Sequence, residues 1–334
     1  MAETKHSPID LVFPWVDGSD PAWQAEKAAF TQKSGGDARS IRYRDWDTLK
    51  YLFRGIEQNL PWIRTVHFIT WGHLPSWLNT ECEKLHVVNH RDYIPAQYLP
   101  TFSSHTIELN MHRIEGLSER FIYANDDMFF LRPLPAEFFF RDGLPVDRAA
   151  QNVLQFRRRD GIDHIVANNL TVINTDFSKR DCIRRAPAKW LTPKYGAKAL
   201  KNLYLMGVSN FTGFEDYHIP YAYLKSTLLE VWEREYTWLD ATCSHRVRCN
   251  EDVNQWLFRY WQLASGRFYP GSAVPGALFA IGPDDEKIED VITHRKLPMC
   301  CLSDDDEQLD FEKENARLCG WFSQILPEKS AFEK

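Results

Sequence analysis

Short apolar runs alternate with helical patterns along the first 130 residues. Apolar runs bounded by turn-forming residues predict buried strands, at 9–16, 65–70, 84–89 and 121–124. Apolar residues spaced three and four apart predict helices, over 21–33, over 47–59, and around Ile107 as far as Gly116. This alternation favours an α/β fold with a mostly parallel, doubly wound sheet flanked by helices, in which ligands bind outside the carboxyl ends of the strands.

The pattern is less regular beyond residue 150. Here we predict a strand pair at 165–174 and a basic irregular segment at 178–206. Two short strands are predicted at 277–282 and 288–293. Further helices are predicted around Leu228, Trp256 and Leu318. We therefore expect one domain over 1–334, with an α/β core built by 1–150 and 270–334 and a mainly helical insertion over 151–269.

Composition excludes several classes of protein. The chain has 334 residues, 44% of them hydrophobic, so it can bury a sizeable core and is not a disordered tail. A net charge of -6, with no basic run longer than Arg157–Arg159, argues against nucleic-acid binding. No apolar run is long enough to span a membrane, and the polar segment 1–8 is no secretory signal. Seven cysteines without a CxxC spacing favour neither a disulfide framework nor a structural zinc site, and we expect a cytoplasmic protein.

Acidic residues follow two of the predicted strands. Asp17 comes after the first strand, and Asp126 with Asp127 comes after the strand at 121–124. Paired carboxylates at such a position suit a divalent cation that offsets the charge of a diphosphate. Turn formation or helix capping is the alternative, and it explains most such residues when each is considered alone.

Other candidate side chains are scattered along the chain. Glu108 lies four residues before His112, on one face of a predicted helix, where the pair is either catalytic or a solvated surface pair. His218 precedes a helix and is either a base or a core histidine. Arg246 and Arg248 are spaced to clamp phosphate, with a surface salt bridge as the alternative.

Several separated segments resemble one known family. They are IDLVFPWVDGSDP from Ile9, the stretch 42–79, the stretch 99–132, YHIP at 217–220, Val247-Arg248 with Glu251-Asp252, and the stretches 301–304 and 327–333. In this order and over most of the chain, they are similar to the Stealth proteins. These are sugar-1-phosphate transferases of bacterial capsules and cell-surface polysaccharides, and the family includes the animal N-acetylglucosamine-1-phosphotransferase.

The resemblance implies a Rossmann-like sheet of the glycosyltransferase-A type, a UDP-hexose donor similar to UDP-GlcNAc, and Mg²⁺ or Mn²⁺. It implies catalytic roles for His218, Glu108, Asp127 and Arg248, with the choice of base between His218 and Glu108 left open. The implied substrate-binding residues are Asp17, Gly18, Asn125, Arg246, Lys329 and Ser330. The implied metal ligands are Asp126, Asp127 and Asp304, although Ser303 stands where the family commonly has Asn.

The function expected from this resemblance is transfer of hexose-1-phosphate to a sugar hydroxyl, with release of UMP, in the synthesis of capsule or cell-surface polysaccharide. The alternatives are a metal-dependent glycosyltransferase that releases UDP and a non-catalytic sugar-binding protein. The helical region 151–269 would face the acceptor. We expect a sugar or polysaccharide acceptor, no nucleic-acid partner, and association with the inner membrane or the capsule machinery.

Overall fold

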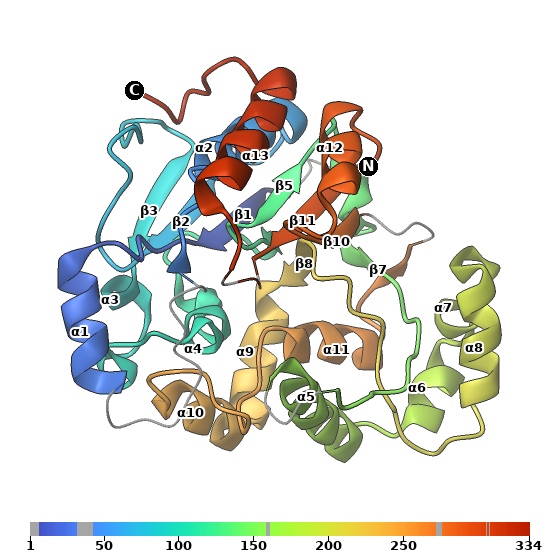
Figure 1. Ribbon diagram of the computed structural model, residues 1–334. Coiled ribbons are helices and arrows are strands. Elements are labelled where there is room, and N and C mark those ends of the chain that lie inside the picture. The colour runs from blue at the N-terminus through green and yellow to red at the C-terminus, as the bar shows by residue number, and fades with distance from the viewer. Residues whose placement is uncertain (1–6, 32–42, 158–160, 272–275, 305, 307) are drawn as a thin grey trace.

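A five-stranded, mostly parallel sheet forms the centre of the protein (Figure 1). The computed structural model describes residues 7–31, 43–157, 161–271, 276–304, 306 and 308–334. The strands of this sheet are ordered β3-β2-β1-β4-β8, and only β8 runs antiparallel to its neighbour. Their bounds are β1 Ile9–Pro14, β2 Val66–Thr70, β3 Leu85–Asn89, β4 Arg120–Tyr123 and β8 Tyr221–Leu224. This confirms a mixed α/β fold with a mostly parallel central sheet.

Two smaller sheets adjoin the central one. The first has the order β10-β11-β5, and the second has the order β6-β7-β9. Their strands are β5 Met128–Phe130, β6 Phe140–Arg141, β7 Leu144–Asp147, β9 Tyr269–Pro270, β10 Gly276–Ala280 and β11 Met299–Ser303. β5 follows β4 after a four-residue turn, so the chain passes from the central sheet to the β10-β11-β5 sheet at Asn125–Asp127.

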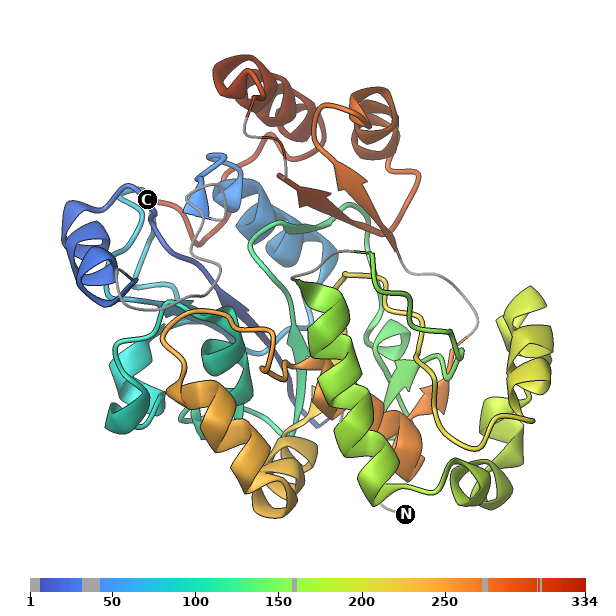
Figure 2. The same ribbon diagram turned by 60° about the horizontal axis from the view of Figure 1, so that its bottom comes forward.

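Helices cover both sides of the strands (Figures 1 and 2). They are α1 Pro21–Thr31, α2 Leu49–Asn59, α3 His90–Tyr93, α4 Ser104–Leu109, α5 Ile162–Asp176, α6 Lys179–Arg185, α7 Pro187–Trp190, α8 Ala197–Leu205, α9 Lys225–Arg234, α10 Tyr236–Ser244, α11 Trp256–Ser265, α12 Asp285–Thr293 and α13 Phe311–Ile325. On one side, Phe53 of α2 contacts Phe13 and Phe68 of the central sheet, with ring centroids 5.3 and 5.5 Å away. No helix among the described residues combines the length and apolarity that crossing a bilayer requires.

Most of the strands and helices predicted in the first 130 residues are confirmed. The four predicted strands correspond to β1, β2, β3 and β4, and the first two helices correspond to α1 and α2. Residues 32 and 33 of the first predicted helix lie outside the described residues. The third predicted helix is shorter than expected, because α4 ends at Leu109 and a 3-10 turn follows over Met111–Arg113.

Three predictions in the second half are wrong. The segment 178–206, which was predicted to be irregular, forms helices α6, α7 and α8. The predicted strand pair at 165–174 is helix α5, and the predicted strand at 288–293 lies within helix α12. Both segments are rich in β-branched residues, which favour strands locally. Their buried positions nevertheless follow the helical period, as Ile288, Val291 and Ile292 do in α12.

The helical region also contributes to the central sheet. Sequence patterns did not reveal β8, which lies within 151–269 yet pairs with β4 as an edge strand. β11 was missed as well. These two strands matter for the site, because both deliver residues to the carboxyl end of β4.

Candidate active site

Three segments that are distant in sequence meet at the turn after β4. β8 is antiparallel to β4 and pairs Tyr221 with Tyr123, so the residues just before β8 lie beside the end of β4. β11 is antiparallel to β5, and its Leu302 N–H donates to the carbonyl oxygen of Asp127 at 3.0 Å. The topology therefore brings His218, Asp127 and Cys301 to one place.

Asp127, His218 and Cys301 form the centre of the candidate site. One side-chain donor atom from each residue lies within 4.8 Å of the other two. Asp127 Oδ1 is buried and has no hydrogen-bond partner among the described residues. A buried carboxylate oxygen without a partner is unfavourable, so this atom marks a position that a ligand would satisfy.

Burial and the neighbouring groups shift the pKa of Asp127 in opposite directions. Burial raises the pKa of Asp127, while the neighbouring His218, the Cys301 thiol and Arg248 act to lower it. The pKa of Asp126 is also raised, by desolvation and by repulsion from Asp127. Since Asp126 is exposed, the repulsion is the cause that the geometry supports. A cation beside the two carboxylates would relieve that repulsion.

The backbone holds His218 in an unusual conformation. Its φ is +28°, in a region that residues other than glycine rarely adopt. The Tyr221 hydroxyl accepts a hydrogen bond from the Tyr217 N–H at 2.8 Å and so closes the turn that carries His218. The imidazole packs edge-on against Trp256, with ring centroids 6.2 Å apart. Backbone strain of this kind is concentrated at functional sites.

Glu108 is a buried residue of α4 with partners on both oxygens. Its Oε1 lies 3.2 Å from the Tyr123 hydroxyl, and its Oε2 accepts from the Gln255 N–H at 3.4 Å. The Tyr123 hydroxyl also lies 2.7 Å from Asn125 Oδ1, and its single hydrogen can be donated to only one of the two residues at a time. Glu108 is therefore linked to the Asp127 turn through Tyr123 and Asn125.

Arg248 reaches the site from the loop between α10 and α11. Its Nη2 donates to Ser104 Oγ on α4 at 2.6 Å, and its charge acts on both Asp127 and Tyr123. The loop is fastened by Asp252, whose fully buried carboxylate accepts from His105 at 2.8 Å and from His245 at 2.7 Å. The four predicted catalytic residues, Glu108, Asp127, His218 and Arg248, are thus drawn together from four segments.

The loop after β1 holds Asp17 and Gly18. The Asp17 N–H donates to His73 Nε2 at 2.8 Å, and His73 Nδ1 donates to Asp20 Oδ2 at 3.0 Å, which makes His73 the Nδ1-protonated tautomer. Asp17 Oδ1 accepts from the Ser19 backbone and hydroxyl. A Cβ on Gly18 would lie 2.0 Å from Tyr43 O, so only glycine fits at this close approach of two chain segments.

The remaining predicted residues have contacts of their own. Arg246 donates to the carbonyl oxygens of Pro100 and Gln97, at 3.2 and 3.1 Å. Asp304 Oδ2 accepts from Trp46 Nε1 at 3.0 Å and lies 3.3 Å from Arg44, contacts that a metal ion would have to share.

Lys329 and Ser330 form their hydrogen bonds within the C-terminal segment. Lys329 Nζ donates to the carbonyl oxygen of Lys334 at 3.0 Å, and Ser330 Oγ donates to Glu333 at 3.1 Å. These bonds tie both residues to the chain end and not to the cluster around Asp127. Glu333 in turn pairs with Arg54 of α2.

Sequence reasoning missed Cys301 as a member of the site. The residue lies within 301–304, one of the stretches that resemble the Stealth family, but it was not among the predicted site residues. Burial and the nearby acid raise the pKa of the Cys301 thiol, so the sulfur stays protonated beside Asp127. Only the pairing of β11 with β5 reveals its position, because no spacing in the sequence connects residue 301 with residue 127.

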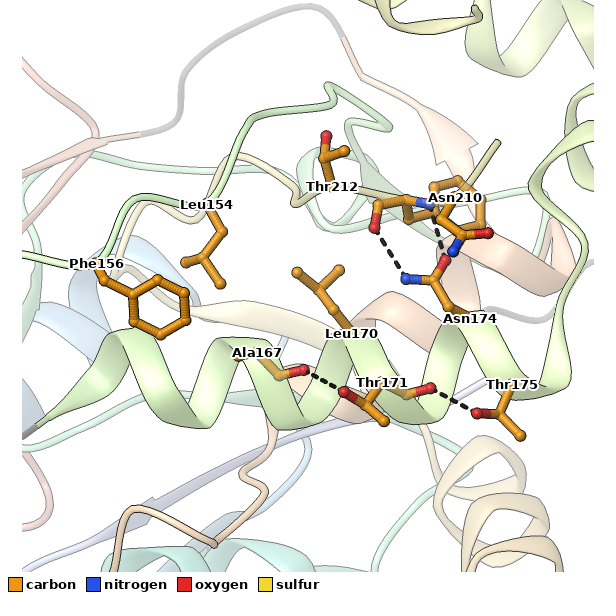
Figure 3. Close-up of a pocket in the computed structure, with 10 residues that line it drawn as sticks. Leu154, Phe156, Ala167, Leu170, Thr171, Asn174, Thr175, Asn210 and Thr212 are labelled. Atoms are coloured by element: carbon orange, nitrogen blue, oxygen red, sulfur yellow. Dashed lines mark hydrogen bonds between the residues drawn. The ribbon is translucent and has the colours of Figure 1, made fainter. Parts of the chain in front are cut away.

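An open cavity lies away from this cluster. It is an open groove of about 470 Å³ between α5 and the segments 154–156 and 210–212 (Figure 3). Asn174 of α5 exchanges two hydrogen bonds with the backbone of Phe211 along one side. None of the predicted catalytic residues lines the groove, so we place the chemistry at Asp127 on side-chain geometry and not on cavity size.

Comparison with known proteins places this chain in a family. Residues 7–35 match "Stealth protein CR1, conserved region 1", and residues 42–146 match "Stealth protein CR2, conserved region 2". The chain is 38% identical to a capsular polysaccharide phosphotransferase, WcwK, of Streptococcus pneumoniae, over 98% of each chain. This chain belongs to the Stealth family.

Other relatives extend the likeness over nearly the whole chain. The Stealth protein described here is 39% identical to the receptor polysaccharide phosphotransferase WefC of Streptococcus oralis, over 97% of this chain and 99% of the relative. It is 36% identical to the exopolysaccharide phosphotransferase cps2G of Lactiplantibacillus plantarum, over 98% and 96% of the two chains. The chain is accordingly a phosphotransferase, and the family resemblance found in the sequence is confirmed.

Proposed function

We propose that this Stealth protein transfers hexose-1-phosphate from a UDP-hexose to a sugar hydroxyl in the synthesis of capsule or another cell-surface polysaccharide. The observation that carries the proposal is the meeting of Asp127 and His218, under the charge of Arg248, at the carboxyl end of β4. His218 supplies a proton acceptor and Arg248 supplies a positive charge at the same position. The printed names of the relatives support a saccharide acceptor.

The reaction is a substitution at phosphorus. The acceptor hydroxyl oxygen bonds to the phosphorus that carries the hexose, and the bond from that phosphorus to the bridging oxygen of UMP breaks. The hydroxyl proton passes to a ring nitrogen of His218, and UMP leaves with the electron pair of the broken bond. Such transfers depend on positioning and on stabilisation of charge, and the guanidinium of Arg248 serves the second need.

The contacts of the two candidate bases favour His218. Glu108 is 6% exposed, and its two oxygens already have Tyr123 and Gln255 as partners. His218 is only half-buried and sits at the tip of a turn. We therefore assign proton transfer to His218 and the orientation of Tyr123 and the Asn125 turn to Glu108.

The acid pair fits a hard divalent cation. Asp126 and Asp127 are adjacent carboxylates that repel each other, and Asp127 Oδ1 is a buried oxygen without a partner among the described residues. Oxygen ligands of this kind suit Mg²⁺ or Mn²⁺ better than the neighbouring thiol of Cys301 does. When bound, the ion would offset the negative charge of the donor diphosphate.

The central sheet supports a nucleotide-sugar donor. Strand order β3-β2-β1-β4 with parallel strands matches a Rossmann-like half, in which ligands lie beyond the carboxyl ends. Asp17, Gly18 and the Asp126–Asp127 pair all follow such strand ends. A cavity of about 190 Å³, lined in part by Trp71 and Asn89, lies at the ends of β2 and β3.

The nucleotide that is released tests the proposal. The enzyme is incubated with UDP-GlcNAc, and then with other UDP-hexoses, in the presence of Mg²⁺ and a panel of acceptor sugars, and the nucleotides are separated by chromatography. We expect UMP in amounts equal to the phosphodiester formed. Release of UDP would instead show attack at the anomeric carbon, and would make the protein a metal-dependent glycosyltransferase.

A further inference from the structure

The segment 178–206 carries an exceptional charge for this chain. It contains eight Lys and Arg residues and one acidic residue, whereas the whole chain has 40 basic and 46 acidic residues. In the structure this segment forms α6, α7 and α8, which lie together at the periphery of the molecule in both views (Figures 1 and 2). Arg180, Arg184, Arg185 and Lys194 are exposed.

The same segment exposes large apolar side chains. Fourteen such side chains are exposed among the described residues, and six of them lie between 191 and 208. Leu200, Leu203 and Tyr204 of α8 are 71%, 59% and 83% exposed. Their spacing of three and four residues puts them on one face of the helix, while Asn202 and Leu205 are buried beneath it. Met206 and Val208 continue the exposed apolar surface after the helix.

Isolated apolar residues on a surface are ordinary, but a contiguous patch marks a binding surface. We propose that α8 and the basic helix α6 form a docking surface for an anionic membrane. Leucine and tyrosine side chains on one helical face insert at the level of the lipid headgroups, and arginine and lysine side chains nearby bind the lipid phosphates. This surface lies outside the candidate active site and does not depend on the reaction proposed above.

The positive charge of this surface favours a lipid bilayer over a second copy of the chain as its binding partner. A symmetric dimer through this surface would place two strongly basic segments against each other, which is unfavourable. An anionic bilayer offers negative charge to the exposed basic side chains and an apolar phase to the exposed apolar side chains. The rest of the chain, with 32 basic and 45 acidic residues, would be repelled by the same bilayer and so kept facing away from it.

The docking surface is tested by sedimentation of the full-length protein with vesicles. We expect binding to vesicles that contain phosphatidylglycerol, weaker binding at high salt, and little binding to pure phosphatidylcholine vesicles. Replacing Leu200, Leu203 and Tyr204 together by serine should weaken binding about tenfold or more. Replacing Arg180, Arg184 and Arg185 together by glutamine should weaken it comparably and reduce its dependence on salt.

A matched control uses exposed apolar residues on other helices. Leu229 of α9 and Tyr236 of α10 are 50% and 53% exposed, and their double replacement by serine should leave vesicle binding unchanged. Circular dichroism and thermal unfolding establish that each variant is folded. The proposal is overturned if the wild-type protein does not bind anionic vesicles, or if the control variant loses binding as strongly as the α8 variant. Self-association or capture of an acidic protein through α8, without vesicle binding, would overturn it too.

Discussion

At the scale of single residues, the site contains residues whose backbone or side chain is held in an unfavourable or tightly restricted state. His218 has a positive φ, and Asp127 Oδ1 is buried without a partner among the described residues. Gly18 is required where the loop after β1 passes Tyr43. The free energy that these features cost is tolerated because the surrounding contacts fix them, and such features mark the parts of a protein on which function depends.

Replacing His218 by alanine should lower kcat by about 10²–10⁴-fold and change the KM for the donor much less, since the variant loses a proton acceptor and not a binding group. Steady-state release of nucleotide measures both constants. His294→Ala is the matched control, because His294 lies on the surface at the end of α12. Activity near that of the wild type in His218→Ala would remove His218 from the mechanism.

Replacing Asp127 by asparagine should lower turnover about a hundredfold or more and raise the concentration of Mg²⁺ needed for half-maximal activity, because a neutral amide binds a divalent cation weakly. Activity is titrated with Mg²⁺ after treatment with EDTA. Asp290, a partly exposed residue of α12 that pairs with Lys296, provides the control variant Asp290→Asn, which should respond to EDTA and Mg²⁺ as the wild type does. An unchanged Mg²⁺ titration in Asp127→Asn would place the cation elsewhere.

At the scale of elements, buried hydrogen bonds hold the Arg248 loop against its neighbours. Asp252 joins the loop to α4 through His105, and Asn168 of α5 donates to the carbonyl oxygens of Asn250 and Asp252, both at 2.8 Å. Asp252 touches none of the proposed reacting groups, so it is a positioning residue. The loop itself has no helical or strand pattern, and its shape depends on these bonds.

Asp252→Asn should therefore reduce kcat about tenfold or more, because the amide cannot accept hydrogen bonds from both histidines. A double-mutant cycle with Arg248→Ala distinguishes positioning from a general loss of stability. The Arg248→Ala substitution should cost less in the Asp252→Asn background than in the wild type, with a coupling energy of about 1–2 kcal/mol. Additive effects would show that Asp252 does not act through Arg248.

Local sequence patterns are sufficient to predict some elements of this fold and insufficient for others. β1, β2, β3 and β4 were predictable because each is a short, mostly apolar run bounded by turn-forming residues. The segment of α5 was predicted to form strands because it is rich in β-branched residues, although its buried residues recur at the helical period. β8 is a four-residue edge strand, too short for its pattern to differ from that of the helix that follows it.

At the scale of the whole molecule, one buried carboxylate ties several parts of the central sheet together. Asp10 of β1 is fully buried and accepts from Arg64 at 2.8 and 2.5 Å and from the Ser118 N–H at 2.7 Å. His67 of β2 lies 3.2 Å away. Burial acts to raise the pKa of Asp10, but the hydrogen bonds from His67, Arg64 and Ser118 outweigh it and hold the pKa well below its ordinary value of 3.8.

A depressed pKa means that ionised Asp10 stabilises the fold above about pH 4, and that this contribution is lost as the pH falls through the folded-state pKa. Asp10→Asn should lower the free energy of unfolding by about 2–3 kcal/mol at pH 7, somewhat less than for a fully buried ion pair, because Arg64 is partly exposed. Urea unfolding at neutral and acidic pH measures the difference, which should shrink below pH 4. A difference that does not change with pH would contradict this account.

The sequence by itself determined the parallel strands, the acidic residues at their carboxyl ends and the family of the chain, because these depend on local periodicity and on residues in a fixed order. The tertiary structure decided which of these residues meet. The antiparallel placement of β8 brings His218 beside Asp127, and the pairing of β11 with β5 adds Cys301. The tertiary structure also places Arg44 and Trp46 beside Asp304, and it leaves one apolar face of α8 exposed. Contacts between segments 90 or more residues apart depend on how the elements pack, and local periodicity carries no information about that packing.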